Sequence, residues 1–127
     1  MRRLIVIAAA MLATTALAAE KPITLTREAN GQTVTAKVGQ TITMKLDSNA
    51  TTGFQWTAAH VNKAVLAAVG EPVYQAPKNG RPGQGGAQLF TWKAVKAGHT
   101  PVSLLYARPW EKDVKPVHVV SFTVVVK

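Results

Sequence analysis

The chain has 127 residues, a net charge of +9 and no cysteine. This length suits a single domain, and without cysteine no disulfide framework is available, so packing alone must hold the fold. The lysines are scattered rather than clustered with aromatic residues, which argues against a nucleic-acid-binding protein. The surplus of positive charge favours acidic partners or anionic surfaces, or serves solubility alone.

The N-terminal segment is typical of a secretory signal peptide. Arg2 and Arg3 form a basic region, residues 4–17 are uncharged and apolar, and Ala16-Leu17-Ala18 supplies the small residues that signal peptidase accepts. The apolar run is shorter than the roughly 20 residues of a membrane-spanning helix, which disfavours a retained anchor. We therefore expect a signal peptide over 1–18, cleavage after Ala18 or Ala19, one domain over 19–127, and export to the periplasm or the medium.

Alternation of apolar and polar residues predicts short strands in the first half of the domain. Strands are expected over 23–27 and 32–38, on either side of Asn30-Gly31, a strong hairpin dipeptide. The run 41–47 alternates most clearly, with Ile42, Met44 and Leu46 on one face. A further strand follows over 54–60. Residues 61–69 suit either a short helix or a short strand.

The same pattern continues to the C-terminus. An extended segment begins at Pro72, residues 75–86 form a long loop rich in glycine and proline, and strands are expected over 87–97, 100–107 and 117–126. The valine run of the last strand is typical of burial on both sides. Seven or eight short strands, with turns every 8–12 residues and no long amphipathic helix, predict an all-β, antiparallel sandwich.

The inventory of reactive side chains does not favour an enzyme. The histidines at positions 60, 99 and 118 are far apart, and none has a second histidine or an acid at metal-ligand spacing. Thr51 or Thr52 as a nucleophile would need an activating base, for which the sequence offers no candidate. We expect no catalytic activity, no metal and no cofactor.

Three loop stretches attract attention. Asn49-Ala50-Thr51-Thr52-Gly53-Phe54 joins two strands with more residues than a turn needs, and forms a narrow backbone ridge that could enter a cleft. Gly83-Gln84-Gly85-Gly86 ends the long loop, and Arg108-Pro109-Trp110 follows the strand 100–107. Alternate loops of a sandwich fall at the same end, so all three can share one rim. An ordinary interstrand loop is the alternative for the first stretch, and its fit to the N-glycosylation pattern is taken as chance.

These stretches resemble the signature of the chagasin-type inhibitors of papain-like cysteine peptidases. In that family the loops read Asn-Pro-Thr-Thr-Gly-aromatic, Gly-x-Gly-Gly and Arg-Pro-Trp, in this order, and here Ala50 stands where the family usually has Pro. The resemblance implies an immunoglobulin-like sandwich whose residues 51–53 cover the catalytic Cys–His pair, while residues 83–86 and 108–110 grip the cleft walls. It implies reversible, competitive and non-covalent inhibition, and we expect a monomer.

The alternative is a non-inhibitory sandwich that binds an anionic surface, a polysaccharide or an envelope partner. It rests on the mature charge, which is +7 once the two N-terminal arginines are subtracted from +9, and on Tyr74, Tyr106 and Trp110 as candidate exposed aromatics. It predicts binding that weakens steeply with salt and survives mutation of Thr52 and Gly53.

Overall fold

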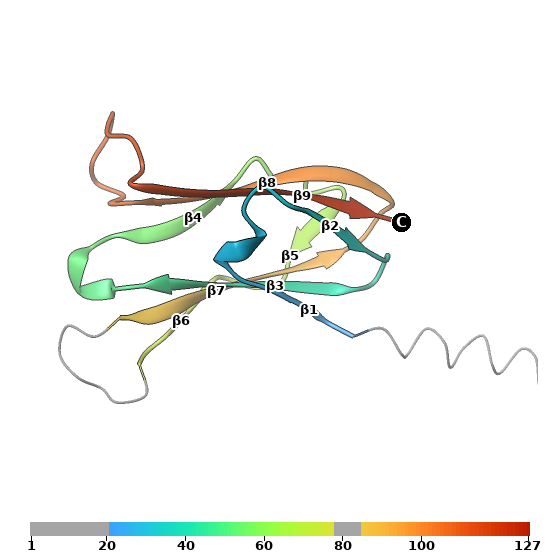
Figure 1. Ribbon diagram of the computed structural model, residues 1–127, viewed down its shortest axis with the longest axis horizontal. Helices are drawn as coiled ribbons and strands as arrows, with labels where there is room; N and C mark the ends of the chain where they lie inside the picture. Colours follow the sequence, from blue (N-terminus) through green and yellow to red (C-terminus); the bar gives the residue numbers. More distant parts are fainter. Residues whose placement is uncertain (1–20, 78–84) are drawn as a thin grey trace, which may run out of the picture.

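The computed structural model describes residues 21–77 and 85–127, which form nine strands in two sheets packed face to face (Figure 1). The first sheet has the order β1 (Ile23–Leu25), β3 (Thr41–Ser48), β7 (Gly86–Ala94) and β5 (Leu66–Ala68), and β6 (Val73–Gln75) also pairs with β7. The second has the order β2 (Thr33–Ala36), β9 (His118–Val126), β8 (Gly98–Ala107) and β4 (Gln55–Ala59). The predicted sandwich is confirmed. Two of its strand pairs, β1 with β3 and β2 with β9, are parallel.

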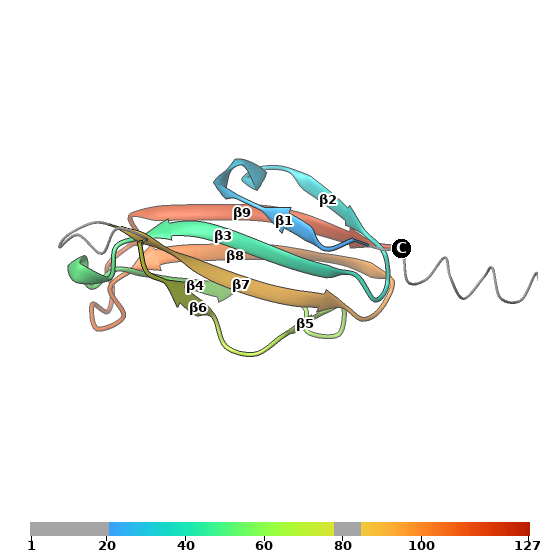
Figure 2. The same cartoon turned by 90° about the horizontal axis from the view of Figure 1, so that it is seen from below.

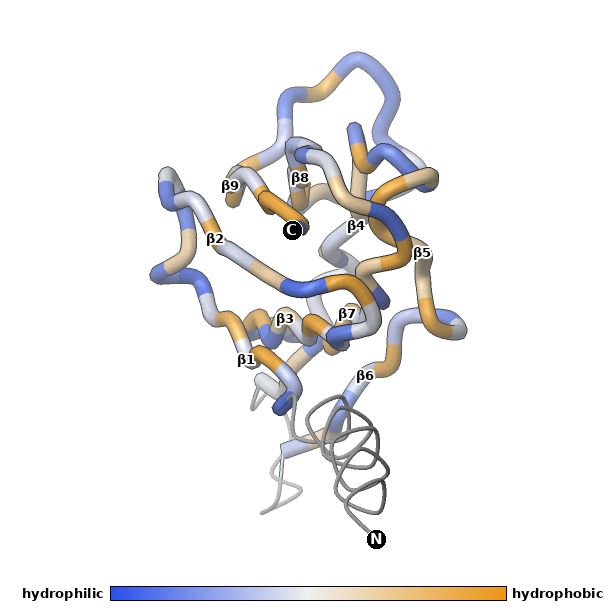
Figure 3. The backbone as a smooth tube through the Cα atoms, turned by 90° about the vertical axis from the view of Figure 1, so that its right-hand side faces the viewer, coloured by the Kyte–Doolittle hydropathy of each residue, from blue (hydrophilic) through white to orange (hydrophobic). Residues whose placement is uncertain are grey.

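Figure 3 shows the two sheets end-on, and the hydrophobic core lies between them. Alternate residues of a strand point to opposite faces, so Ile42, Met44 and Leu46 of β3 turn inward and are fully buried, as the alternation predicted. They face the inward side chains of β8 and β9, among them Val102, Leu104, Val120 and Val124. No helix in the described part of the chain is long and apolar enough to cross a membrane.

The expected N-terminal hairpin at Asn30-Gly31 is wrong. The two flanking strands lie in different sheets, because the 3-10 turn η1 (Arg27–Ala29) carries the chain across the sandwich. The dipeptide docks on β9 instead: the backbone N–H of Ser121 donates to the Asn30 Oδ1 at 2.8 Å, and the Gly31 N–H donates to the Ser121 carbonyl at 2.7 Å. The turn itself forms, since the Gln32 backbone N–H donates to the Ala29 carbonyl at 2.9 Å, but the bonds to Ser121 dock it on β9 instead of placing it between two paired strands.

Two further expectations about strands are settled by the structure. Residues 61–69 contain a strand, β5, and no helix. The last strand is buried on one face only, since Val120 is 1% exposed but Val119 is 48% exposed. The valine run had indicated two buried faces, but the described residues place no third layer on the outer side of this sheet (Figure 1). Its outer valines therefore suit strand geometry without being core.

Strand register brings three connections to the same end of the sandwich. Ser48 at the end of β3 pairs with Gly86 at the start of β7, and Gln55 at the start of β4 pairs with Ala107 at the end of β8. The β3–β4 loop, the entry to β7 and the β8–β9 loop consequently lie together, at the left of Figures 1 and 2. The shared rim expected from the sequence is present for the described residues. Gly83 and Gln84 lie outside them.

Candidate functional site

Asn49 organises the loop of residues 49–54, called here the Thr-Gly loop. Its Oδ1 accepts hydrogen bonds from the Thr51 backbone N–H at 3.1 Å and the Thr51 hydroxyl at 2.6 Å. Its carbonyl accepts from the Thr52 backbone N–H at 3.2 Å and the Thr52 hydroxyl at 2.8 Å. These bonds close the 3-10 turn η2 (Ala50–Thr52) and hold both threonine hydroxyls within the loop. The loop is therefore a braced ridge of exposed backbone.

Tyr106 contacts and supports the Thr-Gly loop. Its hydroxyl accepts a hydrogen bond from the Asn49 backbone N–H at 3.3 Å. Its ring centroid lies 5.4 Å from that of Phe54 and 4.8 Å from that of Trp56, so both ends of the loop rest on one aromatic cluster. Tyr106 is half-buried in this cluster, which weakens its use as an exposed platform in the alternative function.

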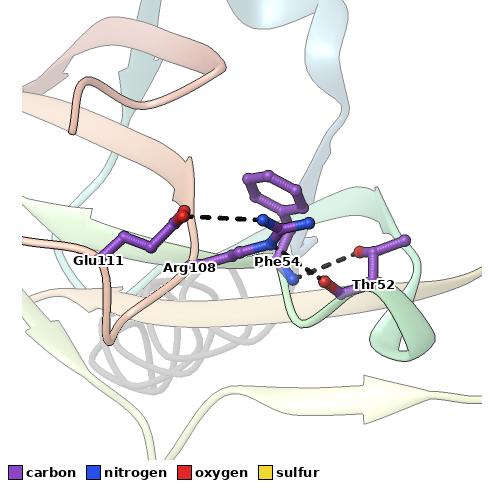
Figure 4. A network of polar contacts seen from close by, with 4 residues as sticks. All are labelled: Thr52, Phe54, Arg108 and Glu111. Carbon is purple, nitrogen blue, oxygen red and sulfur yellow. Dashed lines mark hydrogen bonds and ion pairs between the residues drawn. The ribbon is translucent and has the colours of Figure 1, made fainter.

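Arg108 joins the Thr-Gly loop to the loop of residues 108–117, called here the Arg-Pro-Trp loop (Figure 4). Its Nε donates to the Thr52 carbonyl at 3.3 Å, and its guanidinium carbon lies 4.4 Å from the centroid of the Phe54 ring. An ion pair with Glu111 at 3.7 Å holds the guanidinium from the other side. The exposed ion pair contributes little alone, but the stacked cation and the hydrogen bond fix one loop against the other.

Trp110 lies against Gly53 and remains 66% exposed, so it is not a core aromatic. Gly53 has φ +82°, a conformation that side-chain-bearing residues rarely adopt. A Cβ atom placed there would also collide with the indole of Trp110. Glycine therefore suits this position for its backbone conformation, and a larger residue would displace the exposed indole from its place against the loop.

Gly85 and Gly86 bring neighbouring strands close to the start of β7. A Cβ on Gly86 would collide with the Gln75 carbonyl and lie 2.8 Å from the Tyr74 hydroxyl, and a Cβ on Gly85 would lie 3.3 Å from the Ser48 carbonyl. Because the two glycines have no side chains, β6 and the end of β3 can pack closely against the start of β7, beside the Thr-Gly loop.

Sequence reasoning found the loop residues but missed the residues that brace them. Tyr106 shares the inward phase of Val102 and Leu104, and it precedes Arg108 by two positions. That phase could have identified it as the support of the rim. The contact of Glu111 with Arg108 depends on the conformation of the loop and could be found only in the structure. Within residues 21–77 and 85–127, no group of three His, Asp or Glu side chains could hold a metal ion.

Comparison with known proteins agrees with this geometry. Residues 35–126, which include all three loops, match the family model described as chagasin family peptidase inhibitor I42. Chagasin of Trypanosoma cruzi is 35% identical over 91 residues, covering 68% of this chain and 81% of chagasin.

Solved structures agree on the fold. The crystal structure of the cysteine protease inhibitor EhICP2 from Entamoeba histolytica aligns with a TM-score of 0.75 at 22% identity, covering 86% of this chain and 98% of that one. PbICP-C, in its complex with falcipain-2, aligns with a TM-score of 0.62 at 16% identity, covering 86% of this chain and 93% of that one. The chain belongs to the chagasin family of peptidase inhibitors, and it is an inhibitor of cysteine proteases rather than an enzyme.

Proposed function

We propose that the rim formed by the Thr-Gly loop, the glycines at the entry to β7 and the Arg-Pro-Trp loop occludes the active-site cleft of a papain-like cysteine peptidase. The observation that carries this proposal is the bracing of two loops into one unit, through Arg108 on Thr52 and Phe54 and through Trp110 on Gly53. A rim ordered before binding loses less conformational entropy on association. The complex of PbICP-C with falcipain-2 supports a peptidase of this class as the partner.

Each part of the rim has a role that follows from its chemistry. Residues 51–53 present backbone groups to a cleft that binds extended peptide, and they would lie over the catalytic Cys–His pair. Trp110 is exposed beside this ridge, and tryptophan and arginine are the residue types most enriched at binding hot spots. The threonine hydroxyls are bonded to Asn49 and brace the loop, and we expect the reversible, non-covalent inhibition that the family resemblance implies. Residues 83–86 complete the contact along the opposite wall.

The same proposal places the inhibitor outside the cytoplasm as a monomer. Support comes from the basic and apolar N-terminal segment and from Ala16-Leu17-Ala18, which fit a cleaved signal peptide. Mass spectrometry of the exported protein tests this directly. A mature N-terminus at Ala19 or Glu20 is expected, and recovery of the intact chain from the membrane fraction would contradict it.

Inhibition kinetics test the occlusion. Papain is assayed on a fluorogenic peptide with increasing amounts of the mature chain. Competitive inhibition is expected, with a raised apparent KM and an unchanged kcat, at concentrations of about 1 µM or below, which corresponds to about 8 kcal/mol of binding. A lowered kcat with unchanged KM, once inhibitor and substrate have reached equilibrium on the enzyme, would show that the rim does not occupy the substrate cleft. Full activity at that concentration would count against papain as a target, and the same result with a panel of related peptidases would count against the proposal.

A further inference from the structure

The outer face of the second sheet changes from apolar to polar along its strands. The alternation in β8 and β9 turns Leu105 and Val119 outward, and these two residues are cross-strand partners. One step further from the rim, the outward pair is Ser103 and Ser121, whose hydroxyl oxygens lie 3.2 Å apart. On β8 and β9 the half of the face that adjoins the three loops is therefore apolar, and the exposed Gln55 and Thr57 of β4 border this apolar half.

The apolar half continues into the Arg-Pro-Trp loop. Val114, Val117 and Val119 are 56%, 53% and 48% exposed. Together they form what we call the outer strip, which comprises Leu105, Ala107, Val114, Val117 and Val119. Figure 1 shows the loop rising on the β8–β9 side of the sandwich.

The strip contains a small hollow that touches the rim. A cavity of about 140 Å³ is lined by Ala107, Val114 and Val117 together with Phe54 and Arg108. The last two residues brace the Thr-Gly loop, so the hollow is continuous with the proposed binding site. Its charged edge is formed by Arg108, Glu111 and Lys115.

Single exposed valines are common on protein surfaces, and others occur here, such as Val38 and Val95 at the opposite end. The outer strip differs because its members are contiguous and adjoin the rim. An apolar patch framed by charged residues is the usual composition of a protein interface.

We propose that the outer strip makes a second contact with the peptidase, beside the cleft, and that the hollow receives one aliphatic or aromatic side chain from the cleft wall. This inference rests on the proposed function, since the peptidase must first engage the rim. It extends the site from the three loop motifs to the sheet face behind the Arg-Pro-Trp loop.

The test uses Val117→Thr and Val119→Thr, singly and together. Threonine keeps the β-branched shape and strand preference of valine but replaces one methyl group by a hydroxyl. Burying one methyl group is worth about fourfold in affinity, so we expect each variant to raise the inhibition constant against papain about fourfold, and the double variant by about tenfold or more. Val95→Thr is the matched control at the far end, and it is expected to inhibit like the parent.

The outcomes distinguish failure of the proposed strip contact from failure of the proposed inhibitor function. If the parent chain inhibits and the double variant, with an unchanged melting temperature, inhibits equally well, the strip is not part of the interface and the inference is overturned while the inhibitor function stands. If the parent does not inhibit any papain-like peptidase, the proposed function fails and the inference fails with it. Sedimentation of the free chain tests whether a second copy of this chain binds the strip instead. A dimer of the parent that the double variant dissociates would assign the strip to a second copy and overturn the peptidase contact.

Discussion

Replacing Gly53 by alanine perturbs the rim at the point where its two loops meet. The new methyl group would occupy the space of the Trp110 indole, and the backbone would keep φ +82° only at a cost. A non-glycine residue in a left-handed conformation costs about 1–2 kcal/mol, which lowers the free energy of unfolding. The tryptophan must also move, and loss of a hot-spot side chain costs about 2 kcal/mol or more of binding. We expect the inhibition constant to rise about 30-fold or more, since about 1.4 kcal/mol is a factor of ten.

Gly31→Ala is the control that introduces the backbone strain of a positive φ without a clash with Trp110. Gly31 has φ +79°, close to that of Gly53, but a Cβ there would meet no atom within 4 Å. It also lies on the turn before β2, away from the rim. The control should therefore lose a similar amount of stability in thermal unfolding and keep its inhibition constant against papain.

Tryptophan quenching reports the displacement itself. The chain has three tryptophans, and two of them, Trp56 and Trp92, are only 4% exposed. Quenching by acrylamide therefore reads mainly Trp110, and Gly53→Ala should raise it because the indole leaves its seat. Inhibition by Gly53→Ala at the parent level, or an equal loss in Gly31→Ala, would refute the account of the rim.

Four other changes probe the parts of the rim and of the scaffold. Trp110→Ala should raise the inhibition constant by about 30-fold, or about 2 kcal/mol, with unchanged thermal stability, and an unchanged constant would remove Trp110 from the site. Arg108→Lys keeps the charge but loses the planar guanidinium that stacks on the Thr-Gly loop, so the inhibition constant should rise about fivefold. Unchanged inhibition by this variant would show that only the positive charge of Arg108 matters. Ala50→Pro should tighten inhibition up to about fivefold, because fixing φ at this position contributes about 0.4–1 kcal/mol, and weaker inhibition would show that the turn does not accept proline. Gln88→Leu removes a side-chain amide that accepts from the Trp56 backbone N–H at 2.8 Å and donates to the Trp56 backbone carbonyl at 3.3 Å. Denaturant unfolding should therefore show a free energy of unfolding lower by about 1–3 kcal/mol, with the inhibition constant unchanged.

Local pattern was enough to predict most of the strands. Burial of Ile42, Met44 and Leu46 follows from a period of two, and this signal needs no knowledge of the partner strand. The errors arose where local and tertiary information differ. Asn30-Gly31 has hairpin chemistry, but hydrogen bonds to Ser121 use it for a crossing between sheets.

The loop motifs were likewise visible in the sequence, whereas their bracing was not. Arg108 and Thr52 are 56 positions apart, and their hydrogen bond depends on the register of β4 with β8. The contact of Trp110 with Gly53 likewise depends on the register of these two strands. Glycine and tryptophan could be assigned separately to a flexible turn and an exposed anchor, but only the fold shows that one is the support of the other.

The most direct test of cleft occlusion is the accessibility of the catalytic thiol in the peptidase. Papain is treated with an alkylating reagent in the presence of saturating inhibitor, and labelling is followed by mass spectrometry. The inhibitor contains no cysteine, so it adds no competing thiol. Labelling should slow in proportion to the fraction of papain bound, and at an inhibitor concentration about ten times the parent's inhibition constant Trp110→Ala, about 30-fold weaker, should restore most of the rate. Labelling of fully bound papain at the rate of the free enzyme would show that the three loops do not cover the active site.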